Sequence, residues 1–238
     1  MKLYVYCLTE SFDSPPESLN GISGETVRLL ELGDFSVLVS DFAAEAVPVN
    51  RANALAHAAV VRSVLDQTTP LPFRFGSLVT EQQLKSYVTA RGDALKAKLE
   101  LVRGCVEMSV KIIWDREWTE EPASSDEKLS PGTAFLVEKR RELRGSGARA
   151  EEAKRIAGWL EERLREVVRK STFGTNSTDK LLVSAAHLVE RGAIEEYRSR
   201  LKNARLERPD LHFLASGPWP PYSFANIDLE FKTQFGVS

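Results

Sequence analysis

The feature that most constrains this chain is a proline-rich stretch near its end, Gly217-Pro218-Trp219-Pro220-Pro221-Tyr222-Ser223-Phe224. Its prolines lack a backbone N–H and fix φ at about −65°, and each restricts the residue before it to extended geometry. We therefore expect a stiff turn, neither a helix nor a central strand, after a short strand over residues 211–215. Trp219, Tyr222 and Phe224 on such a frame either fill a core or anchor a partner protein.

Hydrophobic periodicity in the first half of the chain predicts strands alternating with helices. Two apolar runs joined at Gly33-Asp34 have the pattern of a β-hairpin. Helices are expected over residues 51–67, with the apolar stripe Ala54, Ala58, Val61 and Leu65, and around a second stripe of Leu84, Val88, Leu95, Leu99 and Val102. Strands are expected over residues 2–8, 26–32, 35–39 and 72–76 and, from almost strict alternation, over 106–114.

An acidic segment with prolines, residues 115–133, is typical of a linker between domains. We expect an N-terminal ferredoxin-like α+β domain over residues 1–114, a C-terminal α+β domain with long helices over 134–225, and a tail over 226–238. Within the second domain, the pattern predicts a helical region over 134–170 interrupted near Gly145-Ser146-Gly147, a central strand over 180–190 and a helix over 193–204. The fold class predicted is α+β, with two antiparallel sheets covered by helices.

Composition narrows the classes of partner. The net charge of −2 at pH 7 provides no general attraction to nucleic acid or to an anionic membrane surface. The chain has no apolar run of membrane-spanning length and no secretory signal pattern at its start. Cys7 and Cys105 lie in strand-like runs and are expected to be buried free thiols in a reducing compartment. We expect a cytoplasmic protein that binds neither nucleic acid nor membrane.

Catalytic and metal-binding patterns are weak in this sequence. There is no Gly-x-Ser-x-Gly, P-loop or Gly-x-Gly-x-x-Gly motif, and the cysteines and histidines lack metal-ligand spacing. His57 is expected on a helix surface or partly packed, and His187 as a hydrogen-bonded core residue. His212 precedes the aromatic turn and could orient it. We therefore predict a non-enzymatic protein with no catalytic residue, no metal and no cofactor.

A single basic cluster, Lys139-Arg140-Arg141, invites a test for nucleic-acid binding. Glu138 and Glu142 flank it, which favours a solvated helix face with ion pairs over a binding patch. The aromatic strand signature of RNA-binding sheets is absent from the sequence.

Three segments together resemble the gas vesicle GvpF/GvpL family. The first is a Pro-x-Arg-Phe-Gly motif made by Pro72, Arg74, Phe75 and Gly76, and the second is the proline-rich stretch that begins at Gly217. Between them, Gly132 followed by Arg140-Arg141 is similar to the family's central segment. The resemblance extends over residues 1 to about 225. It marks as motif or structural positions Pro72, Gly76, Gly132, Arg140, Arg141, Gly217, Pro218, Pro220 and Pro221.

This resemblance implies a ferredoxin-like arrangement and an accessory role in gas vesicle assembly, in the cytoplasm or in association with the vesicle. The implied partners are the small hydrophobic shell protein GvpA and other gas vesicle accessory proteins. A free shell subunit exposes apolar surface and strand edges that favour aggregation, so an accessory protein should offer an apolar groove or an open strand edge.

Two sets of partner-binding residues follow, each with a structural alternative. Trp219, Tyr222 and Phe224 bind a partner or seal the interface between the two domains. Arg74, beside Phe75, pairs with an acidic group of a partner or with a carboxylate of the linker such as Glu120. Without the resemblance, the next interpretation is a ferredoxin-like regulatory or small-molecule-binding module, which requires a concave pocket with convergent polar groups.

Overall fold

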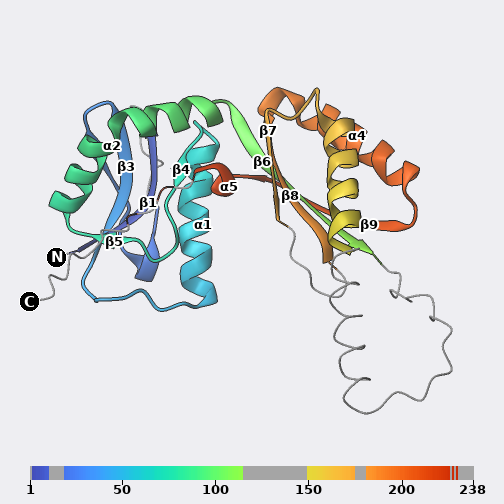
Figure 1. The fold of residues 1–238 in the computed structure, drawn as a ribbon. Helices are drawn as coiled ribbons and strands as arrows, with labels where there is room; N and C mark the ends of the chain where they lie inside the picture. Colours follow the sequence, from blue (N-terminus) through green and yellow to red (C-terminus); the bar gives the residue numbers. More distant parts are fainter. Residues whose placement is uncertain are drawn as a thin grey trace, which may run out of the picture. The chain divides into compact units, whose positions relative to one another are not determined.

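The chain forms two compact units in the computed structural model (Figure 1). The structure describes residues 2–10, 19–114, 149–174, 181–225, 227 and 229. The first unit comprises Met1–Glu107 together with Pro218–Ser238, and the second comprises Met108–Gly217. The expected linker over residues 115–133 lies outside the described residues, and the expected domain boundaries stay a prediction. The division into compact units places the end of the proline-rich stretch with the N-terminal residues.

The first unit is built on an antiparallel sheet with β1 (Lys2–Glu10) in its middle. Strand β1 pairs with β3 (Phe35–Phe42) on one side and with the short strands β4 (Leu71–Pro72) and β5 (Leu78–Val79) on the other. Strand β2 (Arg28–Leu32) pairs with β3 and forms the edge. The predicted hairpin is confirmed, and Gly33 turns the chain with a φ of +67° that favours glycine.

Two helices accompany this sheet, and each begins at a capping residue. Helix α1 (Arg51–Leu65) begins after Asn50, whose side chain accepts a hydrogen bond from the Asn53 N–H. Helix α2 (Glu81–Val102) begins with a capping box between Thr80 and Gln83. The apolar stripe predicted for α2 is confirmed, because Leu84, Val88, Leu95, Leu99 and Val102 are all buried.

The stripe predicted for α1 is partly wrong. Val61 and Leu65 are buried, but Ala54 and Ala58 are exposed. The buried face is instead made by Asn53, His57, Val60, Val61, Val64 and Leu65. Alanine has little apolar surface to bury, so an alanine-rich helix shows only a weak preference for one face.

The second unit contains a sheet in the order β7-β8-β6-β9. Strand β6 (Cys105–Trp114) confirms the predicted alternation, and β8 (Leu181–Glu190) is interior as expected. Helical residues 149–164 and α4 (Ile194–Glu207) lie beside this sheet (Figure 1). The expected helix over 134–170 is wrong at its end, because β7 (Lys170–Gly174) follows as an edge strand paired with β8. The predicted α+β class with antiparallel sheets and helices is confirmed.

The proline-rich stretch departs from the expected turn. Strand β9 extends from Leu211 to Trp219, and a short helix α5 (Tyr222–Ala225) follows. Strand β9 is an edge strand, where a proline costs no ladder hydrogen bond if its nitrogen faces away from the neighbouring strand. Pro220 and Pro221 directly precede α5, at the end of a helix where N–H groups have no intrahelical partner. The prolines are therefore compatible with both elements.

No helix among the described residues is long and apolar enough to cross a membrane.

Candidate functional site

The first motif forms a strand end and a tight turn. Pro72 pairs with Cys7 of β1, and the Phe73 N–H donates to the Tyr6 carbonyl at 2.9 Å. The chain then turns over residues 74–77, where the Ser77 N–H donates to the Arg74 carbonyl at 3.2 Å and Gly76 has a φ of +88°. The strand expected over residues 72–76 is therefore shorter than predicted, because Gly76 occupies a left-handed conformation that a strand does not contain.

A buried tyrosine connects this turn to helix α1. The Tyr4 hydroxyl accepts a hydrogen bond from the Gly76 N–H at 3.2 Å and lies 2.8 Å from His57 Nδ1. The hydroxyl and Nδ1 of a neutral imidazole form a hydrogen bond at this distance, and the imidazole tautomer decides which of the two atoms donates. The other ring nitrogen, Nε2, is buried and has no hydrogen-bond partner among the described residues.

His57 contradicts the expectation of a surface or partly packed residue. Its side chain is only 4% exposed, and burial lowers its pKa to about 4. The imidazole is therefore neutral at physiological pH. The histidine acts here as a neutral, hydrogen-bonded residue within a core.

His57 is also the point at which the two motifs meet. The centre of the Phe75 ring, from the first motif, lies 6.0 Å from the centre of the His57 ring and 6.3 Å from that of Tyr4. The ring of Tyr222, from the second motif, lies 6.5 Å from His57. Tyr6 stacks on the imidazole, with the two ring centres 5.8 Å apart. We call Tyr4, Tyr6, His57, Phe75 and Tyr222 the aromatic cluster.

Helix α5 is held in the first unit by charged side chains. The Glu107 carboxylate accepts hydrogen bonds from the Ser223 N–H at 2.7 Å and from the Ser223 hydroxyl at 2.9 Å. At the other end, Lys98 Nζ donates to the Ala225 carbonyl at 2.7 Å. Burial raises the pKa of Glu107, and the two hydrogen bonds from Ser223 act in the opposite direction. These contacts fix both ends of α5.

Apolar anchors complete this attachment. Pro220, Pro221, Phe224 and Ala225 are buried, and Ile227 forms a parallel bridge with Phe73. Phe224 is thus a core residue of the first unit. In contrast, Trp219 and Tyr222 are each 40% exposed, and the Arg62 guanidinium lies 5.6 Å from the centre of the Trp219 ring. Of the predicted partner-binding aromatics, the structure leaves Trp219 and Tyr222 accessible, while Phe75 is half-buried.

The other predicted positions are dispersed. Arg74 is exposed in the turn of the first motif. Gly132, Arg140, Arg141 and the proposed ion-pair partner Glu120 lie outside the described residues. His187 is a hydrogen-bonded core residue as predicted, and His212 is exposed. Cys7 and Cys105 are buried free thiols, also as predicted.

Sequence reasoning did not identify Tyr4, His57 and Glu107 as members of this region. Tyr4 looks like any strand aromatic, and Glu107 occupies the less apolar face of an alternating strand. Ser223, the partner of Glu107, is 116 residues away along the chain. The signal that could have identified these residues is a polar group at a position where the pattern of the strand or helix predicts at least partial burial.

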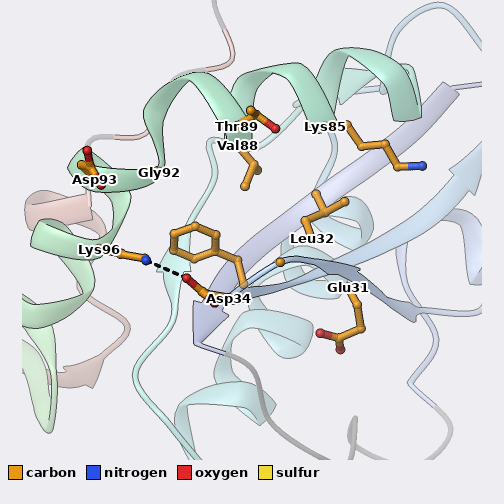
Figure 2. A pocket seen from close by; sticks show the side chains of 11 residues that line it. Glu31, Leu32, Asp34, Lys85, Val88, Thr89, Gly92, Asp93 and Lys96 are labelled. Carbon is orange, nitrogen blue, oxygen red and sulfur yellow. Dashed lines mark ion pairs between the residues drawn. The ribbon is translucent and has the colours of Figure 1, made fainter.

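A surface hollow of about 510 Å³ lies apart from the aromatic cluster, between the β2–β3 turn and α2. Figure 2 shows Lys96 of α2 directed at Asp34 of the turn, an ion pair of 2.6 Å. Glu31 accepts hydrogen bonds from Ser36. These polar groups pair with one another instead of converging on a ligand. Among the described residues, no group of His, Cys, Asp or Glu side chains is arranged to hold a metal ion.

Comparison with known proteins places this geometry in a family. The family model described as "Gas vesicle synthesis protein GvpL/GvpF" matches residues 2–226. Gas vesicle protein L of Streptomyces sp. (strain CB03234) is 27% identical over 249 residues, covering 94% of this chain and 92% of that protein. Gas vesicle protein F1 of Halobacterium salinarum is 24% identical over 239 residues, covering 98% of this chain and 97% of that protein.

Two crystal structures share the fold. GvpF from Anabaena sp. PCC7120 superposes with a TM-score of 0.78 at 19% identity, covering 95% of this chain and 99% of that one. GvpF from Microcystis aeruginosa superposes with a TM-score of 0.77 at 21% identity, with the same coverage.

Proposed function

This chain belongs to the GvpL/GvpF family of gas vesicle synthesis proteins, and from that premise we propose that it binds the gas vesicle shell protein GvpA and keeps it competent for assembly. The family supports a gas vesicle accessory role. The proposal adds the partner, the non-enzymatic mode of action and the surface used. Other gas vesicle accessory proteins are further partners in this proposal.

The observation that carries the proposal is the contrast within the second motif. Phe224 and Ala225 are buried, and both ends of α5 are tied by Glu107 and Lys98. Trp219 and Tyr222, on the same short segment, remain 40% exposed. Large aromatics on a fixed backbone lose little conformational entropy when a partner covers them, which favours their use as anchors.

The chemistry of a shell protein fits such a surface. A subunit that ends up lining a gas-filled compartment carries apolar surface that aggregates in water when it is free. An amphipathic aromatic pair such as Trp219 and Tyr222 can cover part of that surface while its polar atoms remain hydrated. Arg74, exposed beside Phe75, adds a cation that can pair with an acidic group at the edge of the partner.

Co-expression with GvpA tests the proposal. We expect GvpA to stay in solution and to co-purify with the tagged chain, and the double variant Trp219→Ala/Tyr222→Ala to retain much less of it. The matched control is Leu206→Ala/Leu214→Ala, which removes two other exposed apolar side chains, 73% and 57% exposed. Arg74→Ala reduces retention without lowering the melting temperature if this arginine is used for binding.

Each outcome of the test is informative. GvpA that aggregates equally with and without the wild-type chain contradicts the proposed partner. Equal retention by the aromatic variant and the leucine control contradicts the proposed surface. Circular dichroism of both double variants verifies that they are folded.

A further inference from the structure

The outward face of α1 differs from an ordinary solvated helix surface. Arg51, Leu55, Ala58, Ala59 and Arg62 are all exposed and follow one another at spacings that place them on one side of the helix. Leu55 is 58% exposed, and Val49, just before the helix, is 90% exposed. At one end of this face the Trp219 ring lies against Arg62. We call Arg51, Leu55, Ala58, Ala59, Arg62 and Trp219 the α1 face.

The other helices show what a solvated face looks like in this chain. Helix α2 carries the pair Glu81–Lys85 at 2.6 Å. Helix α4 carries Glu195–Arg198 at 2.6 Å and Glu196–Arg200 at 2.7 Å. Helix α1 contains no acidic residue, so its own arginines cannot be neutralised within the helix. Three of the six large apolar side chains that are exposed in the described chain, Leu55, Trp219 and Tyr222, lie on α1 or have a ring contact with it.

The two arginines define the charge of this face. Among the described residues, no carboxylate lies within ion-pair distance of Arg51 or Arg62, in contrast to Arg103, Arg163, Arg169 and Arg208. The ring of Trp219 holds the Arg62 guanidinium in place without neutralising it. Arg51 and Arg62 are separated by three helical turns, or about 16 Å along the axis at 1.5 Å per residue.

We propose that the α1 face binds an amphipathic helix of a partner protein that carries carboxylates on either side of a small apolar stripe. The alanines allow the backbones of two helices to approach closely, and Leu55 and Trp219 supply the apolar contact. Two carboxylates with the same spacing as Arg51 and Arg62 each pair with one guanidinium group, and a bidentate pair uses both carboxylate oxygens. This deepens the proposed function and rests on it, because Trp219 belongs to both surfaces.

Two other occupants fit the face less well. A second copy of the chain packed face to face would bring arginines against arginines, since α1 offers no acidic residue to meet them. A membrane surface would attract the arginines, but the bulky exposed apolar groups of the α1 face are limited to Leu55 and Trp219, and its alanines add little insertion energy.

A designed peptide tests the inference on the full chain. The probe is a helical peptide of the length of α1, with an alanine and leucine stripe and two glutamates spaced to face Arg51 and Arg62. The matched probe has lysines in place of the glutamates. Fluorescence anisotropy should show saturable binding of the glutamate peptide and about tenfold weaker binding of the lysine peptide, with a preference that falls as salt is raised.

Substitutions on the chain locate the binding. Leu55→Glu should weaken binding of the glutamate peptide at least about tenfold, because it removes an apolar contact and adds like charge. Leu206→Glu, on the exposed side of α4, is the matched control and should bind as the wild type does. Both positions are exposed, so the melting temperatures of both variants should stay close to that of the wild type.

Several results would overturn the inference. These are equal affinity for both peptides, equal loss with Leu55→Glu and Leu206→Glu, self-association that Leu55→Glu abolishes, or binding to anionic vesicles in place of the peptide. The proposed function is judged separately by GvpA retention. Retention that Trp219→Ala/Tyr222→Ala abolishes and Leu55→Glu leaves intact removes the α1 face alone, whereas peptide binding without GvpA retention removes GvpA alone.

Discussion

Each unit of this protein buries a histidine whose Nδ1 lies 2.8 Å from a tyrosine hydroxyl, but the two pairs are built in opposite ways. In the first unit the tyrosine, Tyr4, is on a strand and the histidine, His57, is on a helix. In the second unit His187 is on strand β8 and Tyr197 is on helix α4. In both, burial lowers the histidine pKa to about 4 and leaves Nε2 without a hydrogen-bond partner among the described residues.

The pairs differ in what they join. His187 and Tyr197 are ten residues apart and tie one helix to the strand that precedes it, with the ring of Phe173 from β7 beside the imidazole. Tyr4 and His57 are 53 residues apart, and the same tyrosine hydroxyl also holds Gly76 of the first motif. Tyr222 of the second motif lies against His57.

This difference explains why the motif residues cluster where they do. The pair in the second unit is a local helix-strand contact that needs no special turn. The pair in the first unit holds together segments that are distant in sequence, and the glycine and aromatic residues of both motifs are the parts that fit around it. Much of each motif therefore serves architecture, and in the second motif Trp219 and Tyr222 are the large side chains that this architecture leaves exposed.

The largest expected effect comes from removing an anchor of the second motif. Phe224→Ala should lower the free energy of unfolding by about 3–5 kcal/mol, because it leaves a cavity in the first unit. Hydrogen exchange monitored by mass spectrometry should show faster exchange in β1 and β4 and little change in β8. Phe213→Ala, at a residue 3% exposed in the second unit, is the control and should give the reverse pattern. Equal loss of protection in both units with either variant would contradict the division.

The histidine pairs make stability depend on pH in a defined direction. Each imidazole has a folded-state pKa of about 4, below the ordinary value of about 6.5, so the unfolded state binds more protons between these values. The contribution of the two neutral histidines to the free energy of unfolding is complete above about pH 6.5 and is lost as the pH falls toward 4. The loss amounts to at most about 3 kcal/mol per histidine. The raised pKa of Glu107 opposes this loss.

Glutamine substitutions check the assignment by urea unfolding at several pH values. His57→Gln and His187→Gln keep an amide that can donate to or accept from the tyrosine hydroxyl but does not titrate, so each should flatten the pH dependence between about 6.5 and 4. Leu206→Gln, at an exposed position that does not titrate, is the control and should leave the curve as it is in the wild type. A curve that neither core substitution flattens would show that other groups control acid sensitivity.

The sequence was sufficient to predict a helix or strand and its buried face where large apolar residues recur with the period of that element. Helix α2 and strand β6 have large apolar residues at regular spacing, and their buried faces follow from that spacing. Strand β7 was missed because a short edge strand with a polar sequence, Lys170–Gly174, has no strong period. The alanines of α1 misled the choice of its buried face because alanine tolerates burial and exposure almost equally.

The site was harder to predict than the fold, for a physical reason. Partner atoms of buried polar groups come from distant parts of the chain, as with Glu107 and Ser223 or Tyr4 and Gly76. A single polar residue in a strand or helix does not indicate which distant donor will satisfy it. The motif positions were identified through the family resemblance, whereas the contacts that explain them appear only in three dimensions.

Removing the tyrosine hydroxyls compares the two pairs directly. Tyr4→Phe and Tyr197→Phe each leave a buried Nδ1 without its hydrogen-bond partner, which costs about 1–3 kcal/mol. Tyr4→Phe should be the more destabilising, because the Gly76 N–H loses its acceptor as well. Urea denaturation of the two variants gives the comparison. A larger loss with Tyr197→Phe would mean that the contact with the first motif adds nothing to the pair.

The smallest expected effect on stability is at Trp219, and it has a counterpart in the second unit. Arg62 lies over the Trp219 ring, whereas Trp159 has both Arg163 and Arg208 over its ring and Phe213 at 6.4 Å. Trp219→Ala should cost about 1 kcal/mol or less, close to the value of an exposed cation–π contact, and Trp159→Ala should cost more.

Thermal unfolding and GvpA retention, measured on the same preparations, separate the two tryptophans. We expect Trp219→Ala to keep a melting temperature near that of the wild type and to lose part of its GvpA. Trp159→Ala should melt earlier, yet its folded fraction should retain GvpA. If Trp219→Ala instead destabilised the protein as strongly as Trp159→Ala, Trp219 would be a packing residue despite its exposure. The second motif would then be architectural throughout.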